Sequence, residues 1–257
     1  MRILMIGDAV GQTGRQAVAV LLSKLRRELE VDLVIANGEN AAAGRGLTPA
    51  IAQDLFQTGV DVITTGNHIW DQKEIIPHLD RPIPILRPLN YPAGAPGRGV
   101  LEQNGVTIMN LQGRVFMTNI DCPFRAADEA LSKIPPNSVV IVDMHAEATS
   151  EKVAMGWYLD GRVSAVLGTH THVGTVDARI LPRGTAFVCD VGMTGARDSV
   201  IGDVVDKVLQ RFLTGMPVRL EVATGPAILN AVLVEVDEGS GRARHIERVD
   251  RETGHDQ

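Results

Sequence analysis

The sequence is poor in the features that mark several protein classes. It has two cysteines and few aromatic residues, two Trp, two Tyr and five Phe in 257 positions. Cys122 and Cys189 have neither metal-type nor redox-type spacing, so we expect reduced thiols in a cytoplasmic protein rather than a disulfide scaffold. No stretch approaches the roughly 18 apolar residues of a membrane span, and no small-residue cleavage site follows the first apolar stretch. We therefore expect neither a membrane partner nor a signal peptide.

The charge balance lacks a basic block. The chain carries 25 Lys and Arg against 31 Asp and Glu, a formal net charge of -6. This balance argues against broad binding to a phosphate backbone, so no stable nucleic-acid partner is expected, although a small positive pocket for one phosphate remains compatible with it. The hydrophobic share of 44% and charged share of 22% are those of a globular protein. We expect one domain over residues 1–257 with a hydrophobic core large enough to be stable without disulfide cross-links.

The order of patterns predicts an α/β fold. Short β-branched runs are followed by Gly-containing turns and then by segments with helical spacing, an alternation typical of parallel strands with helical crossovers. Strands are expected at residues 2–6, 31–36, 60–65, 106–110, 139–144 and 164–167. Helices are expected at residues 15–30, 126–133, 150–159 and 204–213, and from an N-cap at Thr48 to Gly59. Residues 227–235 and 242–248 are expected to form a hairpin. Together these patterns indicate layered mixed sheets, two of them packed together.

Side chains able to bind metals follow the expected strands. They stand just past five separate segments: Asp8, Glu39, Asn40, Asn67, His68, His145, His170 and His172. The carboxyl ends of parallel strands form the crevice in which open α/β sheets bind ligands. A single histidine after a strand is more often structural, but the coincidence of five segments predicts a common site.

The donor types indicate a transition-metal centre for phosphoryl chemistry. Apart from His68, the set contains three imidazoles, two carboxylates and two Asn amides, which suit Mn, Fe, Zn or Co better than Ca. Seven donors exceed the need of one open site, whereas two ions sharing a carboxylate would use them and could clamp a phosphoryl group. Only Asp8 and Glu39 bring negative charge. Two divalent ions would therefore leave the pocket positive and attractive to a phosphate ester.

These residues also carry a resemblance. In order, the blocks that match are Gly7-Asp8, Gly38-Glu39-Asn40, Gly66-Asn67-His68, the segment from Asp143 to Glu147, and Gly168-Thr169-His170-Thr171-His172. They resemble the blocks of calcineurin-like metallophosphoesterases, and more closely those of the YmdB-like bacterial branch. The first block lacks the His that the superfamily has two residues after its Asp, and Glu39 stands where a bridging Asp is usual. The resemblance implies an α-β-β-α sandwich with mixed sheets.

The resemblance further implies a mechanism. One ion would be held by Asp8, Glu39, Asn40 and His172. The other would be held by Glu39, Asn67, His145 and His170, with Glu39 bridging. His68 would donate a proton to the leaving oxygen while a hydroxide bridging the ions attacks the phosphorus. The implied cofactors are two divalent or mixed-valence ions, Fe or Mn first and Zn next, and the implied substrates are small phosphodiesters, 2′,3′- or 3′,5′-cyclic nucleotides.

Other interpretations stay open at this stage. The same metals would serve a phosphomonoesterase or 5′-nucleotidase, and a regulatory nucleotide-binding protein with slow turnover is a third hypothesis, although it would not need His68. The metal, the substrate and any pairing between copies of the chain are undetermined. Asp143 and Glu147 either orient ligands or are structural, and Trp70 either walls the pocket or packs in the core. We expect the remaining polar candidates on the surface: His78, His245, His255, Arg242, Arg244 and Arg248.

Overall fold

A computed structural model describes residues 1–254, so His255 lies outside the described residues. Its first sheet has five strands in the order β14-β13-β1-β3-β4. Their bounds are Ala243–Arg248 (β14), Ala231–Val236 (β13), Arg2–Ile6 (β1), Leu33–Asn37 (β3) and Val62–Thr64 (β4). β1, β3 and β4 run parallel, and the β13–β14 hairpin adds antiparallel strands at the other edge. The sheet is therefore mixed, and the hairpin predicted for the tail is confirmed.

The second sheet has six strands in the order β5-β6-β7-β8-β10-β9. Their bounds are Val100–Gln103 (β5), Val106–Gln112 (β6), Val139–His145 (β7), Ala165–Thr169 (β8), Ala186–Val188 (β10) and Arg179–Ile180 (β9). The four central strands are parallel, and β5 and β9 are antiparallel edges.

The structure also has a third, small sheet that the sequence pattern does not predict. Its order is β15-β12-β11-β2, with bounds Arg251–Glu252, Ala227–Leu229, Met193–Ala196 and Asp8–Ala9. The run expected as one strand over residues 227–235 breaks at Asn230, where β12 joins this sheet and β13 joins the first. Gly7 lets the chain pass from β1 in the first sheet to β2 in the third, close to the backbone of Gly192. A Cβ at Gly7 would lie 1.9 Å from the carbonyl oxygen of Gly192. Strands of two to four residues are too short for periodicity to reveal.

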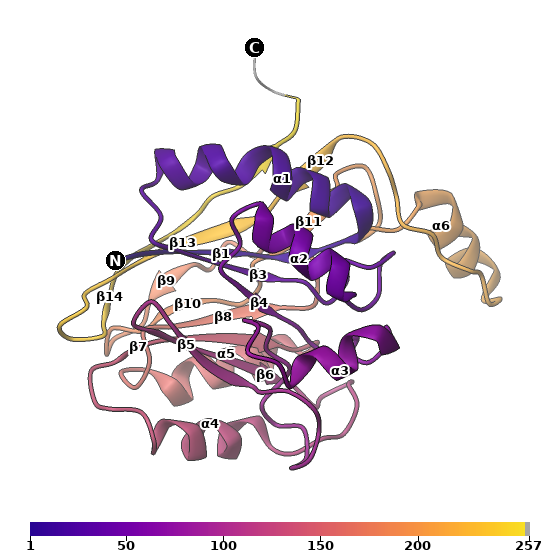
Figure 1. The fold of residues 1–257 in the computed structure, drawn as a ribbon. Coiled ribbons are helices and arrows are strands. Elements are labelled where there is room, and N and C mark those ends of the chain that lie inside the picture. Colours follow the sequence, from indigo (N-terminus) through magenta and orange to yellow (C-terminus); the bar gives the residue numbers. More distant parts are fainter. Residues whose placement is uncertain (255–257) are drawn as a thin grey trace.

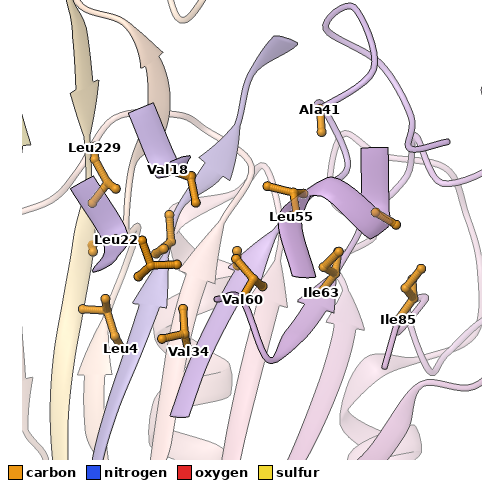
Figure 2. Packing of buried hydrophobic residues seen from close by; sticks show 14 of the residues in the cluster. Leu4, Val18, Leu22, Val34, Ala41, Leu55, Val60, Ile63, Ile85 and Leu229 are labelled. Carbon is orange, nitrogen blue, oxygen red and sulfur yellow. The ribbon is translucent and has the colours of Figure 1, made fainter. Parts of the chain in front are cut away.

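Alternation along the strands produces three apolar layers. In β1, Ile3 and Met5 face the second sheet, whereas Leu4 and Ile6 face the helices on the outer side. That outer layer is covered by α1 (Gly11–Glu28) and α2 (Pro49–Gln57), as Figure 2 shows for Leu22 and Leu55 over the sheet. On the other side, α4 (Pro123–Leu131) and α5 (Thr149–Leu159) cover the second sheet (Figure 1). The α-β-β-α sandwich is confirmed.

The remaining helices lie outside these layers. The short η1 (Lys73–Ile75) and α3 (Ile76–Leu79) belong to the Pro-rich connection after β4, and α6 (Val205–Thr214) projects from the body in Figure 1. Thr48 caps α2 as predicted, its hydroxyl accepting from the Ile51 N–H. No helix within residues 1–254 is long and apolar enough to cross a membrane.

Two local expectations are wrong. α1 begins at Gly11 rather than at residue 15, because its first turn packs on the third sheet and the Thr13 hydroxyl donates to the carbonyl of Ala223 (3.0 Å). Arg248 is not part of a solvated face. Its guanidinium donates to the carbonyls of Thr175 and Val191 and so ties the hairpin to the chain after β8.

Candidate metal centre

The parallel strands of both sheets end at one edge, and the predicted ligands gather there. Ligand atoms of Glu39, His145 and His170 all lie within 4.8 Å of one another. Asn67 Oδ1 is 3.2 Å from His145 Nε2, and Asp8 Oδ1 is 3.9 Å from His172 Nε2. Residues far apart in the sequence therefore meet, as the strand-end argument predicts.

His145 stands at the middle of the cluster. Its Nε2 lies 2.9 Å from Glu39 Oε1, 3.0 Å from His170 Nδ1 and 3.2 Å from Asn67 Oδ1. Ligand atoms held about 2.1 Å from one ion at ordinary coordination angles are separated from each other by roughly 3 Å. The spacing of these four atoms matches a shared ion better than a set of pairwise hydrogen bonds.

A chain of hydrogen bonds fixes the tautomer of His145. The Thr169 hydroxyl donates to Asp143 Oδ1 (2.6 Å), so its oxygen is free to accept the Nδ1–H of His145 (2.9 Å). Asn37 and Thr64 donate to the other oxygen of Asp143. When the ring is neutral, with its proton on Nδ1, His145 presents the Nε2 lone pair to the cluster, the arrangement that metal-binding imidazoles use. Asp143 therefore orients a predicted ligand.

The other two histidines are oriented in the same way. His170 Nε2 is 3.1 Å from Glu147 Oε2, which leaves Nδ1 facing His145. His172 Nδ1 donates to the carbonyl of Ile201 (2.7 Å), which leaves Nε2 facing Asp8. Each ring thus turns its second nitrogen toward the cluster.

The charges of the cluster depend on each other. Burial raises the pKa of Asp8. Burial acts in the same direction on Glu39, but the positive charge of His145 outweighs it and lowers the pKa of Glu39 well below its ordinary value. Burial opposes protonation of His145, yet the Glu39 and Asp8 carboxylates raise its pKa to about 9. The cluster therefore demands a positive charge, which a proton supplies when no metal ion does.

Unpartnered oxygens show that the residues fit a metal. Three of the predicted ligands each bury a side-chain oxygen that, apart from the contact of Glu39 with His145, has no hydrogen-bond partner within residues 1–254: Asp8 Oδ1, Glu39 Oε1 and Asn40 Oδ1. A buried polar atom without a partner is costly unless an ion or water satisfies it. Three such atoms on neighbouring ligands are what an oxygen-binding cation requires.

His68 lies beside the cluster in a tight turn. Its backbone N–H donates to Glu39 Oε2 (3.1 Å), and its ring Nδ1 is 2.9 Å from Asp71 Oδ2. The ring is partly exposed, as a group that meets substrate must be. Asp71 holds the imidazole with Nε2 free, a role that the sequence pattern did not reveal.

The loop that carries His170 and His172 is held by a buried ion pair. Both histidines have positive φ, 98° and 65°, a region unfavourable for residues with a side chain. Lys152 Nζ donates to Asp190 Oδ2 (2.7 Å), and the same carboxylate oxygen accepts from the N–H and hydroxyl of Thr171, between the two histidines. Neither Lys152 nor Asp190 was predicted from the sequence. Asp190 follows β10 and so carries the strand-end signal, whereas Lys152 carries none.

Fold and site together define a class, the metallophosphoesterases: an α-β-β-α sandwich whose strand ends present imidazole, carboxylate and amide ligands. The sequence model described as YmdB-like protein matches residues 4–249. The chain belongs to the YmdB-like family.

Similar proteins span its whole length. A 2′,3′-cyclic-nucleotide 2′-phosphodiesterase of Bacillus subtilis is 48% identical over 97% of this chain and 96% of its own. A crystal structure of a hypothetical protein from Thermus thermophilus is 47% identical with a TM-score of 0.92, covering 98% of this chain and 99% of that one. A crystal structure described as a novel phosphatase of Mycoplasma pneumoniae is 35% identical, also with a TM-score of 0.92, covering 98% and 93%.

Gly66→Ala should destroy the centre while leaving the fold intact. A Cβ at this position would lie 2.1 Å from His145 Cδ2 and 2.4 Å from Glu39 Oε2, so two ligands must move. The backbone there is not left-handed, so alanine itself is tolerated. We expect loss of bound metal by elemental analysis with unchanged circular dichroism. Gly239→Ala, where the added Cβ would lie in ordinary contact 3.5 Å from Asp237 Oδ1 and the backbone is not left-handed, serves as control. Full metal content in Gly66→Ala would contradict the prediction.

Lys152→Met should weaken the loop that carries two of the ligands. The change leaves the Asp190 carboxylate buried without its cation, which costs about 3–5 kcal/mol of unfolding free energy. We expect that loss in urea titrations, and weaker metal binding in native buffer when measured by calorimetry. Lys207→Met, at an exposed lysine, is the control. Wild-type metal affinity in Lys152→Met would show that the ion pair does not position the histidines.

Proposed function

We propose that the chain is a dinuclear metal-dependent phosphodiesterase that hydrolyses 2′,3′-cyclic nucleotides. The observation that carries the proposal is the convergence of ligand atoms on His145 Nε2 beside a partly exposed histidine, His68. The name of the Bacillus subtilis relative supports the choice of substrate.

The ligands divide between two ions. One ion would be held by Asp8, Glu39, Asn40 and His172, and the other by Glu39, Asn67, His145 and His170. Bound there, the ions supply a nucleophile at neutral pH and neutralise charge on the phosphoryl oxygens. The mixed nitrogen and oxygen donors favour Fe or Mn, with Zn also compatible.

The protein's own residues attract the phosphate and donate the proton. Asp8 and Glu39 are the two carboxylates among these ligands, so the loaded pocket keeps a positive excess that draws one phosphate despite the net charge of -6. His68, held by Asp71, donates a proton to the departing ribose oxygen through Nε2. Asp71, in contact with Nδ1, holds the orientation of the ring during that transfer. Cleavage of the 2′ bond leaves a nucleoside 3′-phosphate.

His68→Ala should separate chemistry from metal binding. The protein ligands proposed for the ions do not include His68, so we expect full metal content with kcat for 2′,3′-cyclic AMP lower by roughly 10²–10⁴-fold. Asn67→Ala should lower metal content as well, because Asn67 is one of the ligands. His78→Ala, in the partly exposed connection after β4, should match the wild type in both measurements. A normal rate in His68→Ala would overturn its role.

A panel of substrates tests the reaction class. We expect turnover of 2′,3′-cyclic nucleotides to exceed that of 3′,5′-cyclic nucleotides and of nucleoside monophosphates. Preferred hydrolysis of 5′-monophosphates would make the protein a phosphomonoesterase of the same metal chemistry. One turnover followed by retained product, measured by rapid quench, would make it a nucleotide-sensing protein instead.

A further inference from the structure

A cavity of about 740 Å³ lies between the loop around Tyr91 and helix α4. This volume falls within the range of small-molecule sites, which are mostly apolar with a few polar groups. Leu89, Ala126, Ala130 and Ile134 supply apolar lining. Five charged side chains line it too: Arg87, Asp121, Arg125, Glu129 and Lys133. Arg87 donates to backbone carbonyls and Lys133 donates to Glu129, so a ligand would meet the carboxylate of Asp121 and the guanidinium of Arg125. Arg125 makes no hydrogen bond or ion pair within residues 1–254 that would occupy its guanidinium.

Tyr91 connects this cavity to the metal centre. Its ring packs edge-on against Trp70, two residues beyond His68, with the ring centroids 5.3 Å apart. Its hydroxyl donates to Gln112 Oε1 (3.4 Å), and Gln112 is the register partner of His145 in the neighbouring strand. The same tyrosine therefore lines the cavity and contacts two residues next to the centre, Trp70 near His68 in the chain and Gln112 beside His145 in the sheet.

One further observation points to a polar ligand near Tyr91. Gln112 is fully buried, and its Nε2 has no hydrogen-bond partner within the described part of the chain. Burial raises the pKa of Tyr91, and the negative charge of Glu39 adds to this effect. The Asn90 side chain holds the end of β6, because it accepts a hydrogen bond from the N–H of Gln112 and donates one to the carbonyl of Gln112.

We propose that this cavity binds the nucleoside part of the substrate while its phosphate lies at the metal centre. The inference rests on the proposed function. A nucleobase has apolar faces and a polar edge, which matches a lining of Ala and Leu together with the carboxylate of Asp121 and the guanidinium of Arg125. Tyr91 and Trp70 form the wall between the two halves of the substrate. Neither belongs to the metal ligands, so they determine substrate preference rather than the chemical step.

The first test narrows the cavity without touching the centre. Ala126→Leu adds bulk from α4, and ethylene phosphate, a five-membered cyclic diester without sugar or base, reports the chemistry alone. We expect kcat/KM for 2′,3′-cyclic AMP to fall by about tenfold or more, through KM, with ethylene phosphate hydrolysis unchanged. Ala50→Leu, on the exposed face of α2, is the control. An equal fall for both substrates, or no fall for either, would overturn the proposal.

The second test does not depend on turnover. The chain has two tryptophans, and Trp157 on α5 is half-exposed, so Trp157→Phe leaves Trp70 as the reporter. Titration with 3′-AMP should change its fluorescence, whereas inorganic phosphate should not, and Ala126→Leu should weaken the 3′-AMP response. Identical responses to the two ligands would contradict a nucleoside site. If the wild type hydrolyses neither diester, the proposed function fails, and this titration still decides the binding site.

Discussion

The contact between Glu39 Oε1 and His145 Nε2, 2.9 Å long and buried on both sides, constrains the rest of the structure. A carboxylate can be buried at this depth only if positive charge stands beside it, because desolvation of an unpaired charge is costly. Here His145 supplies the positive charge, in a cluster whose groups come from five strand ends. Three surrounding interactions orient the histidine rings of the site. The hydrogen bonds from His145 to Thr169 and from Thr169 to Asp143 orient His145. The Glu147 carboxylate orients His170, and the Ile201 carbonyl orients His172.

Close backbone approach makes that convergence geometrically feasible. An ideal Cβ on Gly7 would lie 1.9 Å from the carbonyl oxygen of Gly192, and one on Gly168 would lie 1.8 Å from that of Cys189, so the strand ends lie closer than any side chain would permit. Gly66 allows Glu39 and His145 to meet in the same way. Backbone strain at His170 and His172 is accepted because the Lys152–Asp190 pair holds the residue between them. The centre is therefore built by tight packing of main chain, and its ligands have little freedom to rearrange.

Much of this could be predicted from the sequence, for a physical reason. Parallel strands share one carboxyl edge, so polar residues that follow separate apolar runs, such as Asp8 and His145, must converge once the runs are recognised. The N-cap at Thr48 is a local signal of the same reliability, because its hydroxyl and Pro49 act within one turn. The short strands of the third sheet carry no such periodicity. Lys152 lies in a helix of weak amphipathic pattern, and its partner Asp190 is 38 residues away. Tertiary pairing of this kind leaves no trace in local spacing.

Under the proposed function, the architecture separates the chemical step from the choice of substrate. The predicted ligands and His68 follow the ends of strands, and the hydrogen-bonded pairing of those strands holds the side chains in fixed relative positions. Tyr91 and the cavity beside it are built instead by the Pro-rich connection after β4 and by the exposed flank of α4, which share no register with the ligands. A change in that connection can alter what fits without moving His145, whereas a change at the strand ends alters both. The negative net charge is consistent with this division, since attraction for the substrate resides in one local pocket rather than over the surface.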